Sequence, residues 1–181
     1  MTTALAPNPA LATLVADLDA AARRTSPSAT VDAVAAALRP HLGRPDLLAP
    51  DQRVGDPAGY RQHLLHVAPD GAWSLVALVW LPGQATAVHD HVTWCVVGVH
   101  EGYEHETRYR LVGPAGDGVL VEDGTLVSGP GAVAGLLPPG DIHRVVNSGG
   151  GTAISLHVYG ADLRLRTTSI RRRYDLPVRA G

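Results

Sequence analysis

Residues 83–102 read GQATAVHDHVTWCVVGVHEG, and two histidines in this stretch, His89 and His91, are separated by a single residue. Successive side chains of a β-strand point to opposite faces, so residues two apart lie on the same face. The two imidazoles can therefore approach one metal ion from adjacent directions, while Asp90 points away. Gly83 suits a turn that leads into this strand.

A second stretch, residues 138–147, reads PPGDIHRVVN and places a third histidine, His143, directly after a tight turn. Three neutral imidazoles would hold a mid-first-row divalent ion and leave coordination positions open. The spacing does not choose among Fe(II), Zn, Mn, Ni and Cu, because all of them accept imidazole.

Short β-branched runs separated by Gly, Pro and Asp begin near Tyr60. We expect strands over residues 61–68, 73–81, 87–91, 94–100, 104–112, 119–126, 132–137, 143–147 and 152–159. Many short strands at even spacing predict a β-sandwich or a small barrel. No helix-length pattern interrupts them, which argues against parallel βαβ units.

Helical patterns precede the strands. Apolar residues recur at helical spacing over residues 9–24, and a second helix is expected after a cap at Thr30, ending before Pro40. Residues 44–59 are rich in Pro, Gly and Asp and are expected to form a loop with one short helical turn. The chain is thus divided into a helical segment (1–59), a β-barrel (60–163) and a C-terminal tail (164–181).

The composition excludes several classes of protein. The 181 residues suffice for one domain with its own core, and the net charge of −2 argues against a general nucleic-acid binder. The single cysteine excludes an internal disulfide framework and fits a reducing cytoplasm. The first residues lack the basic region of a signal peptide, and no stretch is apolar enough for a membrane helix. We expect a cytoplasmic protein without nucleic-acid or membrane partners, and the oligomeric state is not predicted.

The two histidine stretches together resemble the two motifs of the cupins. Gly83-x5-His89-x-His91-x3-Cys95-x6-Gly102 resembles the first motif, with cysteine where many cupins have glutamate. Pro138-x-Gly140-x2-His143-x3-Asn147 resembles the second. The resemblance implies an all-β fold, a single jelly-roll barrel with N-terminal helices, and a metal ion held by His89, His91 and His143.

A closer resemblance is to the thiol dioxygenases, which include cysteine dioxygenase and 3-mercaptopropionate dioxygenase. It rests on Cys95 and on the run Ser155-Leu-His157-Val-Tyr159, whose three polar residues alternate and so share one strand face. The three can hydrogen-bond in series and bring the Tyr159 hydroxyl to the metal site. The resemblance implies Fe(II) as the cofactor, this trio as a catalytic relay, and oxidation of a small thiol by O2 to its sulfinic acid.

Cys95 has two possible roles. In some cysteine dioxygenases the corresponding cysteine forms a thioether with the tyrosine that matches Tyr159. The alternative is a buried core cysteine without reactivity, a common state for free thiols.

The resemblance also implies which residues bind the substrate carboxylate. Cysteine dioxygenases hold it with an arginine, whereas 3-mercaptopropionate enzymes have glutamine there and use a C-terminal arginine. Aligning Tyr60 and Leu64 places Gln62 at this position, and Arg61, its neighbour, then faces the other way. Gln62 and Arg166 are therefore the expected substrate-binding residues, and 3-mercaptopropionate is the favoured substrate. Cysteine dioxygenase, a dioxygenase of a larger thiol and a non-catalytic metal-binding cupin are the alternatives.

Overall fold

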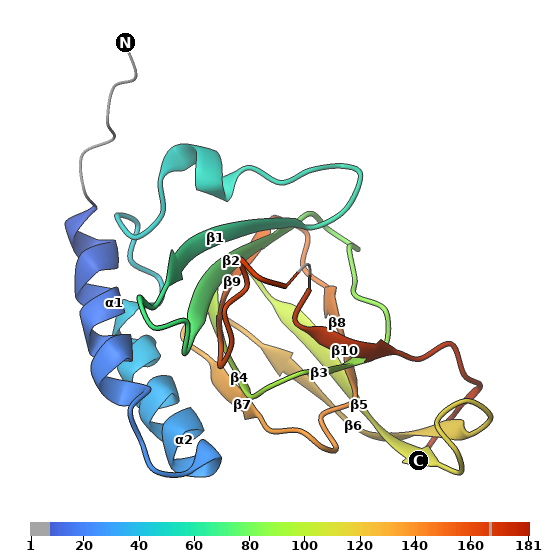
Figure 1. The fold of residues 1–181 in the computed structure, drawn as a ribbon. Coiled ribbons are helices and arrows are strands. Elements are labelled where there is room, and N and C mark those ends of the chain that lie inside the picture. Colours follow the sequence, from blue (N-terminus) through green and yellow to red (C-terminus); the bar gives the residue numbers. More distant parts are fainter. Residues whose placement is uncertain (1–7, 167) are drawn as a thin grey trace.

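The computed structural model describes residues 8–166 and 168–181 and contains two helices followed by two β-sheets (Figure 1). The helices are α1 (Pro9–Ala21) and α2 (Pro27–Leu38), and short 3₁₀ turns follow at Arg39–His41 and Pro50–Arg53. The strands are β1 (Arg61–Val67), β2 (Ser74–Trp80), β3 (His89–His91), β4 (Cys95–Glu101), β5 (Glu104–Val112), β6 (Val119–Ser128), β7 (Val133–Leu136), β8 (His143–Asn147), β9 (Ala153–Tyr159), β10 (Ile170–Arg173) and β11 (Val178–Arg179).

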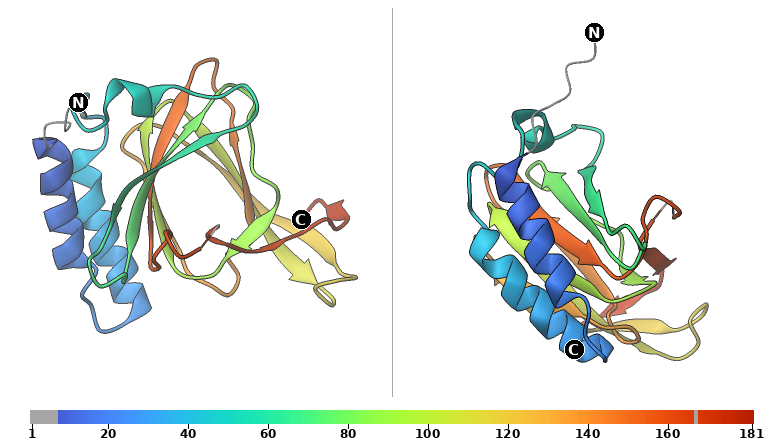
Figure 2. Two further views of the ribbon diagram at one scale, coloured as in Figure 1. Left: turned by 45° about the horizontal axis from the view of Figure 1, so that its top comes forward. Right: turned by 60° about the vertical axis from the view of Figure 1, so that its left-hand side comes forward.

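The two sheets curl around a common interior (Figure 2). One has the strand order β1-β2-β9-β4-β7 and the other β10-β3-β8-β5-β6-β11. Neighbouring strands are antiparallel except β11, which pairs with β6 in parallel. This architecture is the jelly-roll barrel that the sequence predicted.

The second helix begins earlier than expected. Ser26, not Thr30, caps α2, because the Ser26 hydroxyl accepts a hydrogen bond from the Ala29 backbone N–H and Pro27 occupies the first turn. Thr30 lies inside the helix, and its hydroxyl donates to the Ser26 carbonyl. None of the described helices is both long and apolar enough to cross a membrane.

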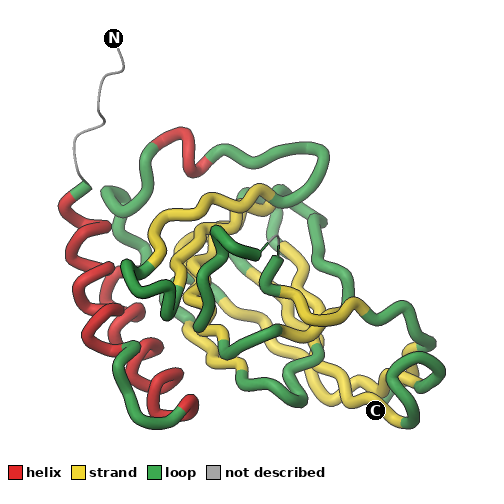
Figure 3. Tube along the Cα trace, viewed as in Figure 1, coloured by secondary structure: helices red, strands yellow, loops and turns green. Residues whose placement is uncertain are grey.

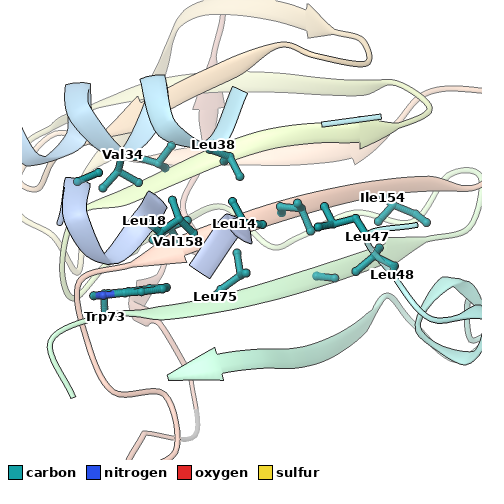
Figure 4. Packing of buried hydrophobic residues seen from close by; sticks show 14 of the residues in the cluster. Leu14, Leu18, Val34, Leu38, Leu47, Leu48, Trp73, Leu75, Ile154 and Val158 are labelled. Carbon is teal, nitrogen blue, oxygen red and sulfur yellow. The ribbon is translucent and has the colours of Figure 1, made fainter. Parts of the chain in front are cut away.

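The helices cover the outer face of the five-stranded sheet, as Figures 1 and 4 show. Fully buried residues of both helices and of the sheet form one cluster, which includes Leu14, Leu18, Val34, Leu38, Trp73, Leu75, Ile154 and Val158. Every residue of β2 and β9 is buried, because the helices lie on one side of these strands and the barrel interior on the other. This explains why both strands are mostly apolar along their whole length.

The C-terminal segment supplies two further strands, although the sequence indicated none there. β10 pairs with β3, and β11 pairs with β6; Figure 3 shows β10 between loops of this segment. Asp90, which points away from the barrel interior, accepts hydrogen bonds from Arg171 and from the Tyr174 hydroxyl, the latter at 2.8 Å. Asp90, on the outward face of β3, therefore anchors the C-terminal segment to the barrel through these hydrogen bonds.

Gly102 provides a test of the barrel packing. Its φ of 74° is in the left-handed region, and a Cβ there would lie 2.7 Å from both the Ala153 Cα and the Thr152 carbonyl oxygen. Gly83 has a similar φ of 78° but open space around it. We expect Gly102→Ala to lower the free energy of unfolding by about 2–4 kcal/mol, from backbone strain plus overpacking, and Gly83→Ala by about 1 kcal/mol, from strain alone. Denaturant unfolding measures both, and equal losses would contradict the packing argument.

Candidate metal centre

The three predicted metal ligands meet inside the barrel. His89 and His91 lie on β3, and His143 lies on β8 directly opposite His89. All three side chains are buried, and one ring nitrogen from each lies within 4.8 Å of the others. The alternation of β3 therefore delivers two imidazoles to the interior, and strand pairing adds the third.

Each of these imidazoles has its Nδ1 occupied by an oxygen acceptor. His89 Nδ1 is 3.0 Å from the Ala87 carbonyl oxygen, His91 Nδ1 is 2.9 Å from Asp141 Oδ2, and His143 Nδ1 is 2.8 Å from a Glu106 carboxylate oxygen. An acceptor at Nδ1 fixes the proton there and leaves the Nε2 lone pair free. The arrangement thus sets both the tautomer and the orientation of all three rings.

The site fits a divalent transition-metal ion. His143 Nε2 is buried and has no hydrogen-bond partner among the described residues. Burying an unpaired polar nitrogen costs free energy unless the nitrogen binds a ligand such as a metal ion. Burial, followed by the charge that the neighbouring histidines can carry, lowers the pKa of His89 to about 3, so its imidazole is neutral at physiological pH. Neutral imidazoles that converge on one point are suitable metal ligands.

Two carboxylates complete the centre, and sequence reasoning missed both. Asp141 also accepts the His91 backbone N–H at 3.1 Å, and Glu106 accepts from Arg108 as well as from His143. Burial acts to raise the pKa of each, but these hydrogen bonds outweigh it and keep both pKa values below the usual range. Asp141 is two residues from His143, whereas Glu106 reaches it only through the pairing of β5 with β8, which no local pattern reveals.

The predicted relay lies on the inward face of β9. Trp80 Nε1 donates to Ser155 Oγ at 3.1 Å, Ser155 Oγ is 2.9 Å from His157 Nε2, and the Tyr159 hydroxyl is 3.1 Å from His157 Nδ1. Burial lowers the pKa of His157 to about 3, so this imidazole also stays neutral. The Tyr159 ring centroid lies 5.9 Å from that of His91, so the series ends beside the metal centre.

A cavity of about 40 Å³ adjoins the three histidines and the relay. Gln62 lines it, together with Tyr60, whereas Arg61 points outward and pairs with Asp56 at 3.2 Å. Arg166 is exposed, and the structure does not bring it to this cavity. Within the described part of the chain, no arginine lines the cavity.

Cys95 and Tyr159 lie directly opposite each other on the neighbouring strands β4 and β9, in one cluster of buried residues. The Cys95 sulfur is 4.0 Å from His157 Nδ1. Burial raises the pKa of the Cys95 thiol, which therefore stays protonated. The pair is adjacent, and the thioether between them stays a prediction.

A jelly-roll barrel with three histidines converging in its interior defines a metal-binding cupin. Similar solved structures include a cupin superfamily protein from Desulfitobacterium hafniense (12% identity, TM-score 0.47, covering 67% of this chain and 90% of that one). Another is an uncharacterized protein with a double-stranded β-helix domain from Klebsiella pneumoniae (19% identity, TM-score 0.48, covering 64% and 84%). The sequence profile described as cysteine dioxygenase type I matches residues 8–169, and the chain belongs to this family.

The carboxylate beside His143 allows a test of the centre. We expect Glu106→Gln to weaken Zn(II) binding about tenfold to a hundredfold, because the charge that orients the ring and raises its basicity is lost. Glu122→Gln, on the exposed part of β6, serves as the control and should leave affinity unchanged. Competition with a chelator measures both dissociation constants. Equal affinity in the two variants would rule out the assigned role of Glu106.

Proposed function

We propose that the protein is a mononuclear Fe(II) thiol dioxygenase that converts a small carboxylated thiol and O2 to the sulfinic acid, with 3-mercaptopropionate as the favoured substrate. The observation that carries this proposal is the buried Ser155–His157–Tyr159 series, which ends beside three convergent histidines in a member of the cysteine dioxygenase type I family. A cupin that only bound a metal would not need this series.

Fe(II), held by His89, His91 and His143, would supply the centre at which the substrate thiolate and O2 meet. The charge around it favours an anionic ligand, because imidazole ligands add no negative charge and Cys95 stands where many cupins place a glutamate. The negative charges of Glu106 and Asp141 lie behind the rings, at their Nδ1 atoms. A thiolate is thus not opposed by a carboxylate in the cavity.

The role of the relay is to hold a proton at the Tyr159 hydroxyl. His157 is neutral and has a nitrogen toward each neighbour, so it can accept a proton on one side and donate one on the other. The tyrosine would then direct a hydrogen bond toward the substrate beside the metal centre. Burial of all three residues excludes the water that would compete for these hydrogen bonds.

The substrate carboxylate would lie near Gln62 and Tyr60, which line the cavity. Their amide and hydroxyl groups are neutral donors, which supports the 3-mercaptopropionate type over an arginine-clamped cysteine enzyme. A cavity of about 40 Å³ has room for roughly three water molecules, which favours a small thiol over a larger one. Cysteine is the second candidate, since the family profile carries its name.

Substrate preference is the first prediction of this assignment. The Fe(II)-loaded protein should consume O2 with 3-mercaptopropionate in preference to L-cysteine, with sulfinate identified by mass. Gln62→Ala should raise KM for 3-mercaptopropionate about tenfold, since a hydrogen bond to a charged group contributes roughly 1.5–3 kcal/mol, while Arg61→Ala should leave KM unchanged. Preference for cysteine would retain the chemistry but overturn the Gln62 assignment. No uptake with any thiol by iron-loaded protein would overturn the dioxygenase proposal.

A second prediction concerns the tyrosine. Tyr159→Phe should lower kcat about a hundredfold, the lower range for positioned proton transfer, while iron content and KM stay unchanged. Tyr103→Phe, an exposed tyrosine, is the matched control and should retain full activity. Steady-state O2 uptake measures kcat and KM of both variants, and metal analysis measures their iron content. Full activity in Tyr159→Phe would remove the relay from the mechanism.

A further inference from the structure

The strand that carries two of the three metal ligands depends on the C-terminal strand for its place in the sheet. Within the described residues, β3 pairs with β8 only at His89, so the backbone at Asp90 and His91 has one neighbouring strand, β10. Backbone hydrogen bonds extend the pairing of β3 with β10 beyond both ends of β3, from the Val92 N–H to the Ser169 carbonyl at 3.0 Å and from the Tyr174 N–H to the Val88 carbonyl at 2.9 Å. The two strands also lie side by side in Figure 1.

One buried carboxylate joins these strands on their outer face. Asp90 is fully buried, and its Oδ2 accepts from Arg171 Nε at 3.2 Å, from a terminal N–H of the same guanidinium, and from the Tyr174 hydroxyl at 2.8 Å. We refer to Asp90, Arg171 and Tyr174 as the Asp90 cluster. A carboxylate buried in this way needs its partners, because an unpaired charge in a protein interior is strongly destabilising.

A bulge in β10 connects the Asp90 cluster to the substrate cavity. The register of β10 against β3 shifts between Ile170 and Arg172, and such a bulge redirects the side chains of a strand. Before the bulge, Thr168, Ser169 and Ile170 line the cavity that adjoins the three histidines. After it, Arg171 and Arg172 lie with Asp90 along a cleft on the other face of the sheet. The same short strand therefore forms a wall of the cavity and holds the outward face of the metal-ligand strand.

We propose that Arg171 and Tyr174 are positioning residues of the metal centre. Through Asp90 they hold β10 against β3, and so they set the place of His89 and His91 and of the cavity wall at residues 168–170. Neither residue touches the metal ligands' ring nitrogens or the substrate. The inference rests on the proposed function only for the identity of the thiol, because the effect on the metal ligands is independent of it.

Loss of the Arg171 guanidinium shows why the effect should reach the metal. The Asp90 carboxylate would keep only the Tyr174 hydroxyl as a partner, so water would have to enter between β3 and β10 to solvate its charge. Asp141 would still accept from the His91 ring and backbone N–H, so the ligand would be misplaced but not lost. Metal sites lose affinity when the groups that orient their ligands are removed.

The test measures Zn(II) affinity of the full chain by competition with a chelator. We expect Arg171→Ala to weaken binding about tenfold, the lower end of the range for groups that orient metal ligands. Arg171→Lys, which keeps the charge but not the forked donors, and Tyr174→Phe, which removes one donor, should each weaken it by less. Arg173→Ala, at an exposed position of the same strand, should leave affinity unchanged. Hydrogen exchange of the Tyr174 amide should be faster in Arg171→Ala than in Arg173→Ala, because that amide closes one end of the strand pair.

Two controls separate positioning from a general loss of stability. Gly102→Ala destabilises the barrel near Ala153, away from β10, and should not change Zn(II) affinity. Tyr109→Phe lies in the same cluster of buried residues as Tyr174 and should also have no effect. Equal weakening in Gly102→Ala and Arg171→Ala would overturn the proposal, and so would unchanged affinity in Arg171→Ala. If Arg171→Ala fails to fold, equal affinities in Tyr174→Phe and Tyr109→Phe would overturn it.

The cavity wall gives a second measurement, on the Fe(II)-loaded enzyme. Arg171→Ala should raise KM for 3-mercaptopropionate severalfold while kcat per bound iron stays unchanged, because residues 168–170 would no longer be held against the cavity. Unchanged KM would overturn the part of the proposal that concerns the wall. Zn(II) affinity is measured without turnover, so the two proposals fail separately. An active thiol dioxygenase whose Arg171→Ala variant binds Zn(II) normally would refute only the role of the Asp90 cluster. Weakened Zn(II) binding in that variant, with no O2 uptake by the wild-type protein, would refute only the dioxygenase.

Discussion

The burial of β9 on both faces is the constraint on which the rest of the structure depends. Ile154, Leu156 and Val158 point outward and pack beneath the helices, while the residues between them point into the barrel. A slip of one residue would place the polar trio under the helices and apolar side chains beside the metal ligands. The apolar contact with α1 and α2, on the far side of the sheet from the three histidines, therefore holds Ser155, His157 and Tyr159 in register.

Polar groups inside the barrel are tolerated because nearly all of them have partners. An unpaired polar group costs several kcal/mol in such an interior, and a lone charge costs more. Each ligand imidazole has an oxygen acceptor at Nδ1, and Ser155 receives the indole N–H of Trp80. Among the described residues, one of the buried side-chain atoms without a hydrogen-bond partner is His143 Nε2, which is the atom to which we assign a metal ion.

The sequence predicted what depends on local patterns. The nine predicted strands and the three predicted ligands lie close to their expected positions. Each depends on a pattern a few residues long: β-branched runs between turn residues for the strands, and the two histidine motifs for the ligands. Glu106 was missed as a participant, since its role arises from the placement of β5 beside β8. The strands β10 and β11 were missed for the same reason: an Arg-rich run shows no apolar alternation, and Asp90 holds it in place through charge. Non-local pairing supplied what the sequence did not show.

The same alternation decides which side chain of β1 lines the cavity. On β1, Gln62 pairs with Leu78, which lines the cavity, and Arg61 pairs with Val79, which belongs to the core beneath the helices. Residues directly opposite each other on neighbouring strands lie on the same face, so the inward direction of Gln62 follows from that of Leu78. Arg61 avoids the apolar core by turning its guanidinium to Asp56 at the strand end. A shift of this strand by one residue would exchange a neutral amide for a cation at the position that we propose for the substrate carboxylate. The register of an edge strand, more than the identity of the metal ligands, would then separate the 3-mercaptopropionate type from the cysteine type.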